Sequence, residues 1–293
     1  MKNLFLKISL LISVVLTDDL DQCYISNDLS RVVVAGGSIT EIIYFLDLDK
    51  YLTAVDVTSN YPDKAKNLPS IGYVRNLSTE GILSLNPTLF LGENDMGPPI
   101  VLEQLKETAL DIRIIPEQHS ANGILEKVYC VGEIMGLEIS QIKEKTIDLN
   151  KNVNRLYELT DKGILKSTRV MFVLNMRGNS PIVAGKGTSG NGFISIIGCK
   201  NAFDNVQGWK PISEESVLNV NPDYIILPNK DIHKSSTIDD ILDNPIFMNT
   251  EAGKNKNFIF EDAMAMLGFG PRTLDIAVKI AESISEKNKT YLE

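Results

Sequence analysis

Histidine and cysteine are scarce in this chain of 293 residues, which contains two histidines and three cysteines. The cysteines, Cys23, Cys130 and Cys199, form no C-x-x-C pair, so the sequence argues against a structural zinc site. The segments around Cys130 and Cys199 are apolar, and we expect both side chains in the core.

Positive charge is also in deficit. The chain has 38 acidic residues against 29 lysines and arginines, which gives a formal net charge of -9 and a pI near 4.9. No run of Lys or Arg provides a local exception. A nucleic-acid partner is therefore not expected, because binding to phosphates needs a basic surface.

The apolar run near the N-terminus is short. It covers residues 8–16, follows a charged start and cannot span a bilayer. We interpret residues 1–24 as an export signal and N-terminal tail, with a buried N-terminal element as the alternative. Leu20 lies three residues before Cys23, as in a lipidation site, but the two residues between them are not small. Lipid anchoring at Cys23 is a minority alternative.

The sequence lacks common enzyme signatures. There is no G-x-x-x-x-G-K-[ST] phosphate loop, and Gly36-Gly37 lacks the G-x-G-x-x-G order of a dinucleotide site. No His/carboxylate or Ser/His constellation is evident. We therefore expect no enzymatic activity, and keep an oxidoreductase of Rossmann type only as the alternative from another functional class.

Short β-branched runs alternate with segments of helical periodicity in the first half of the chain. Strands are predicted at residues 31–35, 52–57, 88–91 and 111–115, and helices at residues 38–46, 78–85, 98–108 and 124–135. This alternation predicts an α/β lobe with a parallel sheet over residues 25–136. Ligands gather at the carboxyl ends of such strands, where the sequence places the loops 36–38, 58–62, 93–99 and 117–119.

The second half of the chain repeats features of the first. Residues 77–91 return as residues 212–226, and the strand at residues 31–34 has a counterpart at 169–173. Two repeated segments at nearly the same offset predict a second, similar Rossmann-like lobe over residues 166–293, with a ligand cleft between the lobes. Apolar residues at helical spacing over 137–165 predict one long rigid linking helix, with a disordered linker as the alternative.

Tyr73 and Arg75 form the centre of the predicted site, in the loop before the helix at residues 78–85. A phenolate is stabilised by a nearby cation, and a tyrosinate can hold ferric haem iron. Taken alone, a Tyr-x-Arg is more often a half-buried aromatic beside a solvated charge. The surrounding motifs have to decide between these interpretations.

Five segments together resemble the haemin-binding periplasmic proteins of ABC-type haem importers. They are Ala35-Gly-Gly-Ser-Ile-Thr-Glu41, Ile71-Gly-Tyr-Val-Arg75, Gly97-Pro-Pro99, Met176-Arg-Gly178 and Gly268-Phe-Gly-Pro-Arg-Thr273. The resemblance runs from about Arg31 to the C-terminus. It implies the two lobes and the linking helix, which cobalamin- and siderophore-binding relatives share, so the fold does not specify the ligand.

Within this resemblance, Tyr73 corresponds to the axial ligand of the haem iron and Arg75 to its neighbouring cation. Because haem is flat, apolar and dianionic at one edge, we expect cations of the second lobe at its propionates. The remaining candidate ligand-binding residues are Gly36, Ser38, Tyr61, Met176, Arg177, Lys186 and Arg272, of which Arg177, Lys186 and Arg272 are the propionate candidates.

The resemblance also leaves alternatives open. Five-coordinate haem is the default, because His119 belongs to the first lobe and His233 to a polar loop. A stacked pair of haems would need His233 or Met176 as a ligand from the second lobe. Cobalamin and a ferric siderophore are the alternative ligands.

The implied partners are a dimeric ABC permease and an outer-membrane haem receptor, with the protein in the periplasm. In the related family, acidic residues on each lobe meet arginines of the permease. The matching candidates are Glu103 on the first lobe and Asp239 and Asp240 on the second. Isolated carboxylates on an acidic protein are more often simply solvated.

Overall fold

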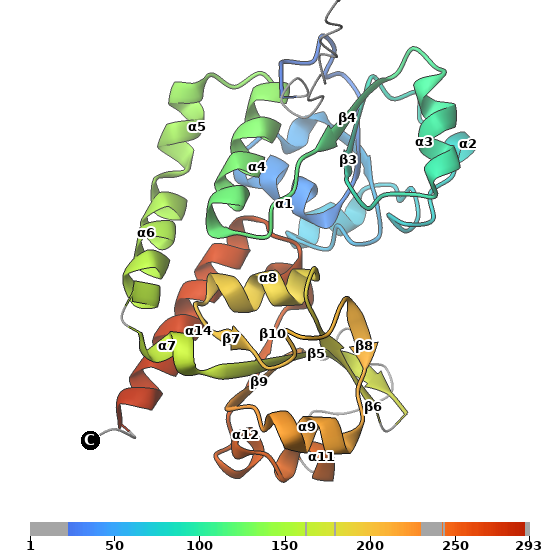
Figure 1. Cartoon of the computed structure of the whole chain (residues 1–293). Coiled ribbons are helices and arrows are strands. Elements are labelled where there is room, and N and C mark those ends of the chain that lie inside the picture. The colour runs from blue at the N-terminus through green and yellow to red at the C-terminus, as the bar shows by residue number, and fades with distance from the viewer. Residues whose placement is uncertain (1–22, 162, 179, 230–241, 243, 291–293) are drawn as a thin grey trace, which may run out of the picture.

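The computed structural model of the chain describes residues 23–161, 163–178, 180–229, 242 and 244–290. The predicted export signal, His233, Asp239 and Asp240 lie outside the described residues. Figure 1 shows two α/β lobes, one above the other, with helices running along one side of both. No helix of the described part is long and apolar enough to cross a membrane.

The first lobe is built on a four-stranded parallel sheet in the order β2-β1-β3-β4. Side chains alternate across it, so that Val32 and Val34 face one layer of helices while Val33 and Ala35 face the other. The strands are β1 (Val32–Ala35), β2 (Leu52–Val55), β3 (Leu89–Glu93) and β4 (Asp111–Ile115). The helices are α1 (Gly37–Phe45) and α4 (Ala121–Ile134) on the first face, α2 (Thr79–Leu83) and α3 (Pro99–Lys106) on the second, and the 3-10 turns Asp49–Tyr51 and Asp63–Asn67.

The second lobe has a six-stranded sheet in the order β10-β9-β5-β6-β8, with β7 beside β5. Its strands β7, β9 and β10 run parallel to β5, whereas β6 and β8 form an antiparallel extension that the sequence did not predict. The strands are β5 (Arg169–Arg177), β6 (Ser180–Ala184), β7 (Lys200–Asn201), β8 (Trp209–Pro211), β9 (Tyr224–Pro228) and β10 (Phe258–Glu261). The helices are α8 (Ser189–Ile196), α9 (Glu214–Val220), α11 (Pro245–Met248), α12 (Glu251–Lys254) and α13 (Ala263–Leu267).

The repeated segments take the same structure in both lobes. Ser78 caps α2 and Ser213 caps α9, each by accepting a bond from the backbone N–H three residues later. After each helix an asparagine adopts positive φ, 47° at Asn86 and 44° at Asn221, and a strand follows. These strands, β3 and β9, pair with β1 and β5 respectively. The predicted two-lobe α/β fold is confirmed.

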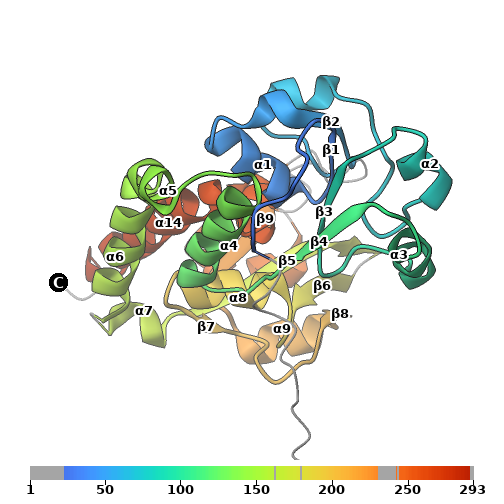
Figure 2. The same ribbon diagram turned by 90° about the horizontal axis from the view of Figure 1, so that it is seen from above.

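The linking segment is helical, but it consists of three helices where the sequence predicted one. They are α5 (Ile139–Lys145), α6 (Ile147–Asp161) and α7 (Ile164–Ser167). The break falls at Thr146, whose hydroxyl is buried and donates to the backbone oxygen of Ile142. A second connection, the last helix α14 (Pro271–Thr290), packs against α6. Figure 2 shows α5, α6 and α14 together on one flank of the molecule.

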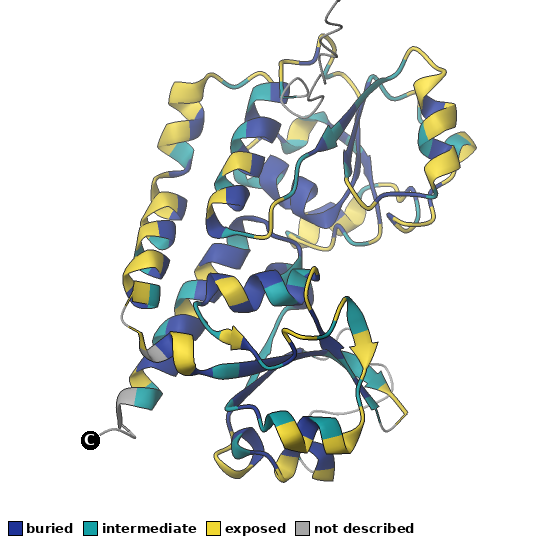
Figure 3. Cartoon of the chain, in the orientation of Figure 1, coloured by how far each residue is buried: buried dark blue, intermediate teal, exposed yellow. Residues whose placement is uncertain are grey.

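One hydrophobic core runs through both lobes and the helices that join them. It includes Val34 of β1, Leu156 of α6, Phe172 of β5 and Leu274 of α14, all nearly or fully buried. Figure 3 shows this continuity as dark blue on the inner faces of α4, α6 and α14. Because packed cores do not deform continuously, this arrangement holds the lobes at a fixed mutual angle.

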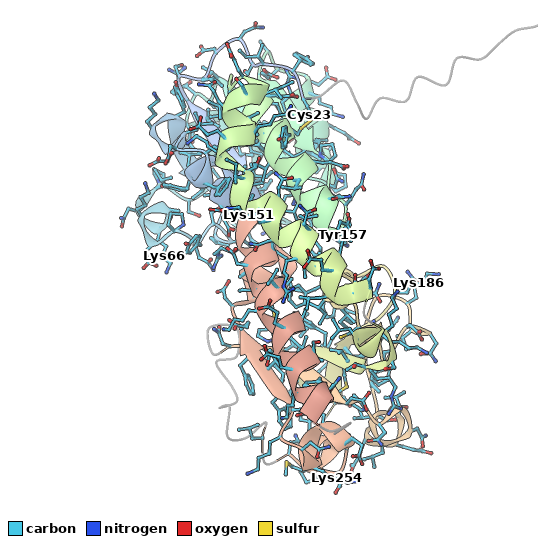
Figure 4. All side chains as sticks on the ribbon, turned by 90° about the vertical axis from the view of Figure 1, so that its left-hand side faces the viewer. Cys23, Lys66, Lys151, Tyr157, Lys186 and Lys254 are labelled. Atoms are coloured by element: carbon cyan, nitrogen blue, oxygen red, sulfur yellow. A yellow bond between two sulfur atoms is a disulfide. The ribbon has the colours of Figure 1, made fainter. Side chains whose placement is uncertain are left out.

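A disulfide joins Cys23 to Cys130 of α4, with Cα atoms 4.8 Å apart (Figure 4). The sequence analysis placed Cys130 in the core, where it lies, but did not pair it. Because its sulfur is bonded to Cys130, Cys23 is not free to carry a lipid thioether in this structure, which corrects the minority alternative. Cys199 is a free, half-buried thiol that packs against the core, and burial raises its pKa to about 12.

Arg272, a predicted propionate ligand, instead joins the two halves of the chain. Its backbone N–H and its Nε each donate to the carboxylate of Glu41 on α1, over 2.8 Å in both cases, and Nη1 donates to Asp262 over 3.3 Å. The guanidinium also lies over the ring of Tyr61, 3.7 Å from its centroid. Glu41 is 5% exposed, and burial raises the pKa of this carboxyl despite the opposing charge of Arg272.

This buried ion pair predicts that Arg272→Ala destabilises the protein by about 3 kcal/mol at pH 7, since it leaves the Glu41 carboxylate buried without its partner. The free energy of unfolding from urea denaturation measures the effect. The matched control is Lys279→Ala, which removes a cation whose side chain is 72% exposed in its pair with Glu261, and should cost less than about 1 kcal/mol. Equal costs for the two variants would contradict the role of Arg272 between the lobes.

Candidate functional site

A cavity of about 680 Å³ lies between the two lobes, within the size range of small-molecule sites. The first lobe lines it with three of the predicted loops, through Thr58, Glu93 to Asp95, and Glu117 and His119, and with the segment Tyr73 to Arg75. The second half of the chain contributes Leu174, Gly187 to Ser189, Gly208, Trp209, Ala263, Met264, Leu267 and Gly268. Ligands therefore have access to strand ends of both sheets.

Tyr73 is held in the cavity wall by its neighbours in the chain. Ile71 and Val74 on either side are buried in the first lobe, while Tyr73 itself is 42% exposed. Gly72 has a φ of 93°, a conformation that favours glycine, and its carbonyl accepts from the N–H of Val57 over 2.9 Å. This loop fixes the backbone and leaves the phenol ring open to the cavity.

Arg75 lies beside Tyr73, as the sequence predicted. Its Nη1 donates to the phenol oxygen of Tyr73 over 3.0 Å, and its Nε donates to Oδ2 of Asp95 over 2.9 Å. Asp95 thereby holds the guanidinium in place, and the sequence analysis did not identify this residue. The arrangement presents a phenol oxygen whose negative form would lie next to a fixed positive charge.

The floor of the cavity is a polar network around the buried ammonium of Lys127 on α4, whose side chain is 1% exposed. Its Nζ donates to Glu117 Oε2 over 2.6 Å, to Ser38 Oγ over 3.1 Å and to the backbone oxygen of Gly268 over 3.3 Å. Glu117 is also hydrogen-bonded to His119 over 2.9 Å. Burial opposes ionisation of Glu117, but His119 and Lys127 outweigh it and lower its pKa.

Glu93, at the end of β3, completes this network. Its Oε1 accepts from Ser38 Oγ over 2.6 Å. Burial raises its pKa to about 7, although the charge of Lys127 opposes the shift. Gly36 lies against it, because a Cβ at Gly36 would come within 2.6 Å of the Glu93 side chain. Gly36 and Ser38 therefore support the floor and do not themselves line the cavity.

The side of the cavity from the second half of the chain is apolar and neutral. Trp209, Leu174, Met264 and Leu267 supply large apolar surfaces, and Thr188 and Ser189 supply hydroxyls. His119 stacks on Phe269 with ring centroids 4.5 Å apart, which fixes the imidazole at the edge between the lobes. Flat apolar ligands fit such walls.

Besides Arg272, four of the residues predicted to bind the ligand lie outside the cavity. Met176 packs against the core of the second lobe, and Arg177 is exposed at the end of β5. Lys186 is exposed at the periphery of the second lobe (Figure 4), and Tyr61, also exposed, packs against the Arg272 guanidinium outside the cavity. The sequence placed these residues near strand ends but carried no information on the direction of their side chains.

A sequence profile described as periplasmic binding protein matches residues 32–264. The chain is similar to the solved periplasmic haem-binding protein RhuT from Roseiflexus sp. RS-1, with 30% identity and a TM-score of 0.79 over 88% of this chain and 99% of that one.

Two further proteins show the range of ligands among its relatives. The periplasmic haem-binding protein HutB of Vibrio cholerae is 31% identical, with a TM-score of 0.74 over 88% of this chain and 98% of that one. A vitamin B12-binding protein of Yersinia pestis is 26% identical over 201 residues, which cover 67% of this chain and 69% of the relative.

The raised pKa of Glu93 predicts a pH-dependent stability effect. The folded protein binds a proton more tightly than the unfolded chain here, so parental stability falls as pH rises from 4.5 towards 7. Glu93→Gln should therefore be about 1–3 kcal/mol more stable than the parent at pH 8 and no more stable at pH 4, by urea denaturation. The control Glu107→Gln, on an exposed residue of the same lobe, should show no such dependence. A Glu93→Gln effect that is the same at both pH values would disprove the assignment.

Proposed function

This chain belongs to the periplasmic binding protein family, whose members bind solutes for ABC importers, and we propose that it captures haem and delivers it to an ABC-type permease. The observation that carries the proposal is the contact between Tyr73 and Arg75 at the cavity wall. A tyrosinate is a ligand of ferric haem iron, and a cation beside its oxygen favours the ionised form. Similarity to two haem-binding proteins at 30% and 31% identity supports the same ligand.

The shape and chemistry of the cavity support haem in one orientation. The apolar surfaces of Leu174, Trp209 and Met264 would cover a porphyrin face opposite Tyr73. Arg75 and His119 are the basic residues among the described lining residues, so the propionates would lie beside them or reach the open mouth of the cavity. The proposed haem is single and five-coordinate, with Tyr73 as its axial ligand.

Cobalamin is the second candidate, and one observation favours it. Glu93, Asp95 and Glu117 all line the same wall, and carboxylates accept hydrogen bonds from the amide groups that a corrin carries. The same wall would repel the propionates of haem unless one carboxylate is protonated or the propionates point away from it. The Yersinia relative named as a vitamin B12-binding protein supports this alternative.

The proposed partner is a permease dimer that meets both lobes. Glu103 is exposed on α3, where the sequence placed the first docking candidate, while Asp239 and Asp240 lie outside the described residues. Similar lobes suit a partner with two-fold symmetry. We place the protein in the periplasm, exported through its N-terminal signal, and an outer-membrane haem receptor as the source of its ligand.

Tyr73→Phe tests the axial ligand. The variant should lose the charge-transfer absorption of a ferric tyrosinate complex and should release haemin faster, since iron loses its only protein ligand in the proposal. Visible spectra and transfer of haemin to apomyoglobin measure the two effects. Tyr157→Phe, on an exposed tyrosine of α6, is the matched control and should behave as the parent does. A Tyr73→Phe spectrum identical to that of the parent would exclude Tyr73 as the ligand.

Arg75→Ala tests the role of the cation. The tyrosinate complex should form only at higher pH in this variant, because the guanidinium no longer stabilises negative charge on the ligated oxygen. A pH titration of the charge-transfer band measures the midpoint. Arg75→Lys keeps the charge and should fall between parent and Arg75→Ala. An unchanged midpoint in Arg75→Ala would show that Arg75 has no electrostatic role.

A further inference from the structure

We propose that Glu93 takes up a proton when a tetrapyrrole with carboxylate groups enters the cleft, so that ligand capture is linked to pH. This inference rests on the proposed function, because it concerns the same cavity and a dianionic ligand. In this proposal, Glu93 determines which ligand charge the cavity prefers. Tyr73 and Arg75 do not have this role, because they act on the iron and on the phenol oxygen that binds it.

Three carboxylates of the first lobe line the cavity, and among them Glu93 has no ion-pair partner within the described residues. Asp95 is paired with Arg75, and Glu117 is paired with Lys127. Within the described part of the chain, Glu93 forms no ion pair. Its carboxylate accepts a hydrogen bond from the neutral hydroxyl of Ser38. With these two pairs balanced, ionised Glu93 adds one uncompensated negative charge to a half-enclosed site.

Lys127 is near enough to act on Glu93 but has no donor left for it. An ammonium group has three N–H donors, and in this structure they are directed at Glu117, Ser38 and the carbonyl of Gly268. Ser38 accepts a hydrogen bond from Lys127 and donates its own hydroxyl to Glu93 in a second hydrogen bond. Lys127 therefore acts on Glu93 through its charge but donates no hydrogen bond to it.

Among the described residues, the charged groups around Glu93 come from several elements. Lys127 comes from α4, Glu117 and His119 from the loop after β4, Asp95 from the loop after β3, and Arg75 lies across the cavity wall. Behind the site, the carboxylate of Asp56 accepts from the N–H of Gly36, the residue that packs against Glu93. Negative groups thus surround Glu93 on several sides, and the nearest cation is already committed.

A bound ligand would shift this balance further towards the protonated form. It displaces water from the cavity, and its carboxylates add negative charge near Glu93; both effects disfavour the ionised carboxyl. The carboxyl of Glu93 already has a pKa of about 7 in the free protein, so a modest further rise produces proton uptake at neutral pH. The protonated carboxyl also gains an O–H donor towards the ligand.

The sign of the pH dependence follows by linkage. If the complex binds more protons than the free protein, affinity falls as pH rises, by up to tenfold for each pH unit above about 7 when one proton is taken up. Ligation of iron by Tyr73 has the opposite effect on the pH dependence: the phenol releases a proton, so affinity rises with pH. The contribution of Glu93 must therefore be measured as a difference between variants that share Tyr73.

The test is calorimetric titration with haemin at pH 8, in two buffers with different heats of ionisation, which gives the number of protons exchanged. Parent, Glu93→Gln and the exposed control Glu107→Gln are compared. The parent and Glu107→Gln should each take up more protons than Glu93→Gln, by up to one, and their affinity relative to that of Glu93→Gln should fall as pH rises from 6 to 8. The same difference should persist when all three carry Tyr73→Phe, because it does not depend on iron ligation.

A measurement on the parent alone covers the case in which Glu93→Gln fails to fold. Difference infrared spectra of the parent with and without haemin at pH 8 should show a new carbonyl band of a protonated carboxylic acid. Equal proton counts in parent and Glu93→Gln, or no such band in the parent, would overturn the role of Glu93 while leaving haem binding intact. Failure of haemin to bind at all would instead overturn the proposed function together with this inference.

Discussion

The buried ammonium of Lys127 is the constraint on which the site depends. A charge that is 1% exposed is tolerated only when all its donors are satisfied, and the three acceptors come from distant parts of the chain. Glu117 follows β4, Ser38 begins α1, and Gly268 precedes α14. The three hydrogen bonds of Lys127 therefore form only when α1, the loop after β4 and the segment before α14 are packed together.

The rest of the architecture keeps this arrangement rigid. A single core continues from the first lobe through α6 and α14 into the second, and the pair of Glu41 and Arg272 joins α1 to the start of α14 close to Lys127. A fixed angle between the lobes means that the cavity is largely formed before a ligand arrives. Ligand choice then depends on the chemistry of the walls, in which an apolar, neutral side faces a wall of paired charges and one unpaired carboxyl.

Local patterns predicted most strands and helices and the proximity of Tyr73 and Arg75, for physical reasons. The strand Asp111–Ile115 has the predicted bounds. Tyr73 and Arg75 touch because both belong to one tight turn, closed by a hydrogen bond from the N–H of Asn76 to the carbonyl of Tyr73 over 2.7 Å. The duplication could also be predicted from the sequence, because a capped helix followed by an Asn-Pro turn is a local pattern that recurs in both lobes.

Contacts between distant residues could not be read in this way. Glu41 and Arg272 are 231 positions apart, and Cys23 and Cys130 are 107 apart. Arg272 was assigned to the ligand because a loop arginine gives no sign of its buried partner. The helix predicted at residues 124–135 contains Lys127, but nothing in the sequence indicates that this side chain is buried and determines the floor of the site.

Binding of ferric haem through a tyrosinate is the function proposed for this cavity. The most direct test is the visible spectrum of the purified parent protein titrated separately with haemin and with cobalamin. Our account predicts saturable binding of haemin with the charge-transfer absorption of a high-spin ferric tyrosinate, and weaker binding of cobalamin. Tight binding of cobalamin, together with a haemin spectrum that shows no tyrosinate absorption, would contradict it.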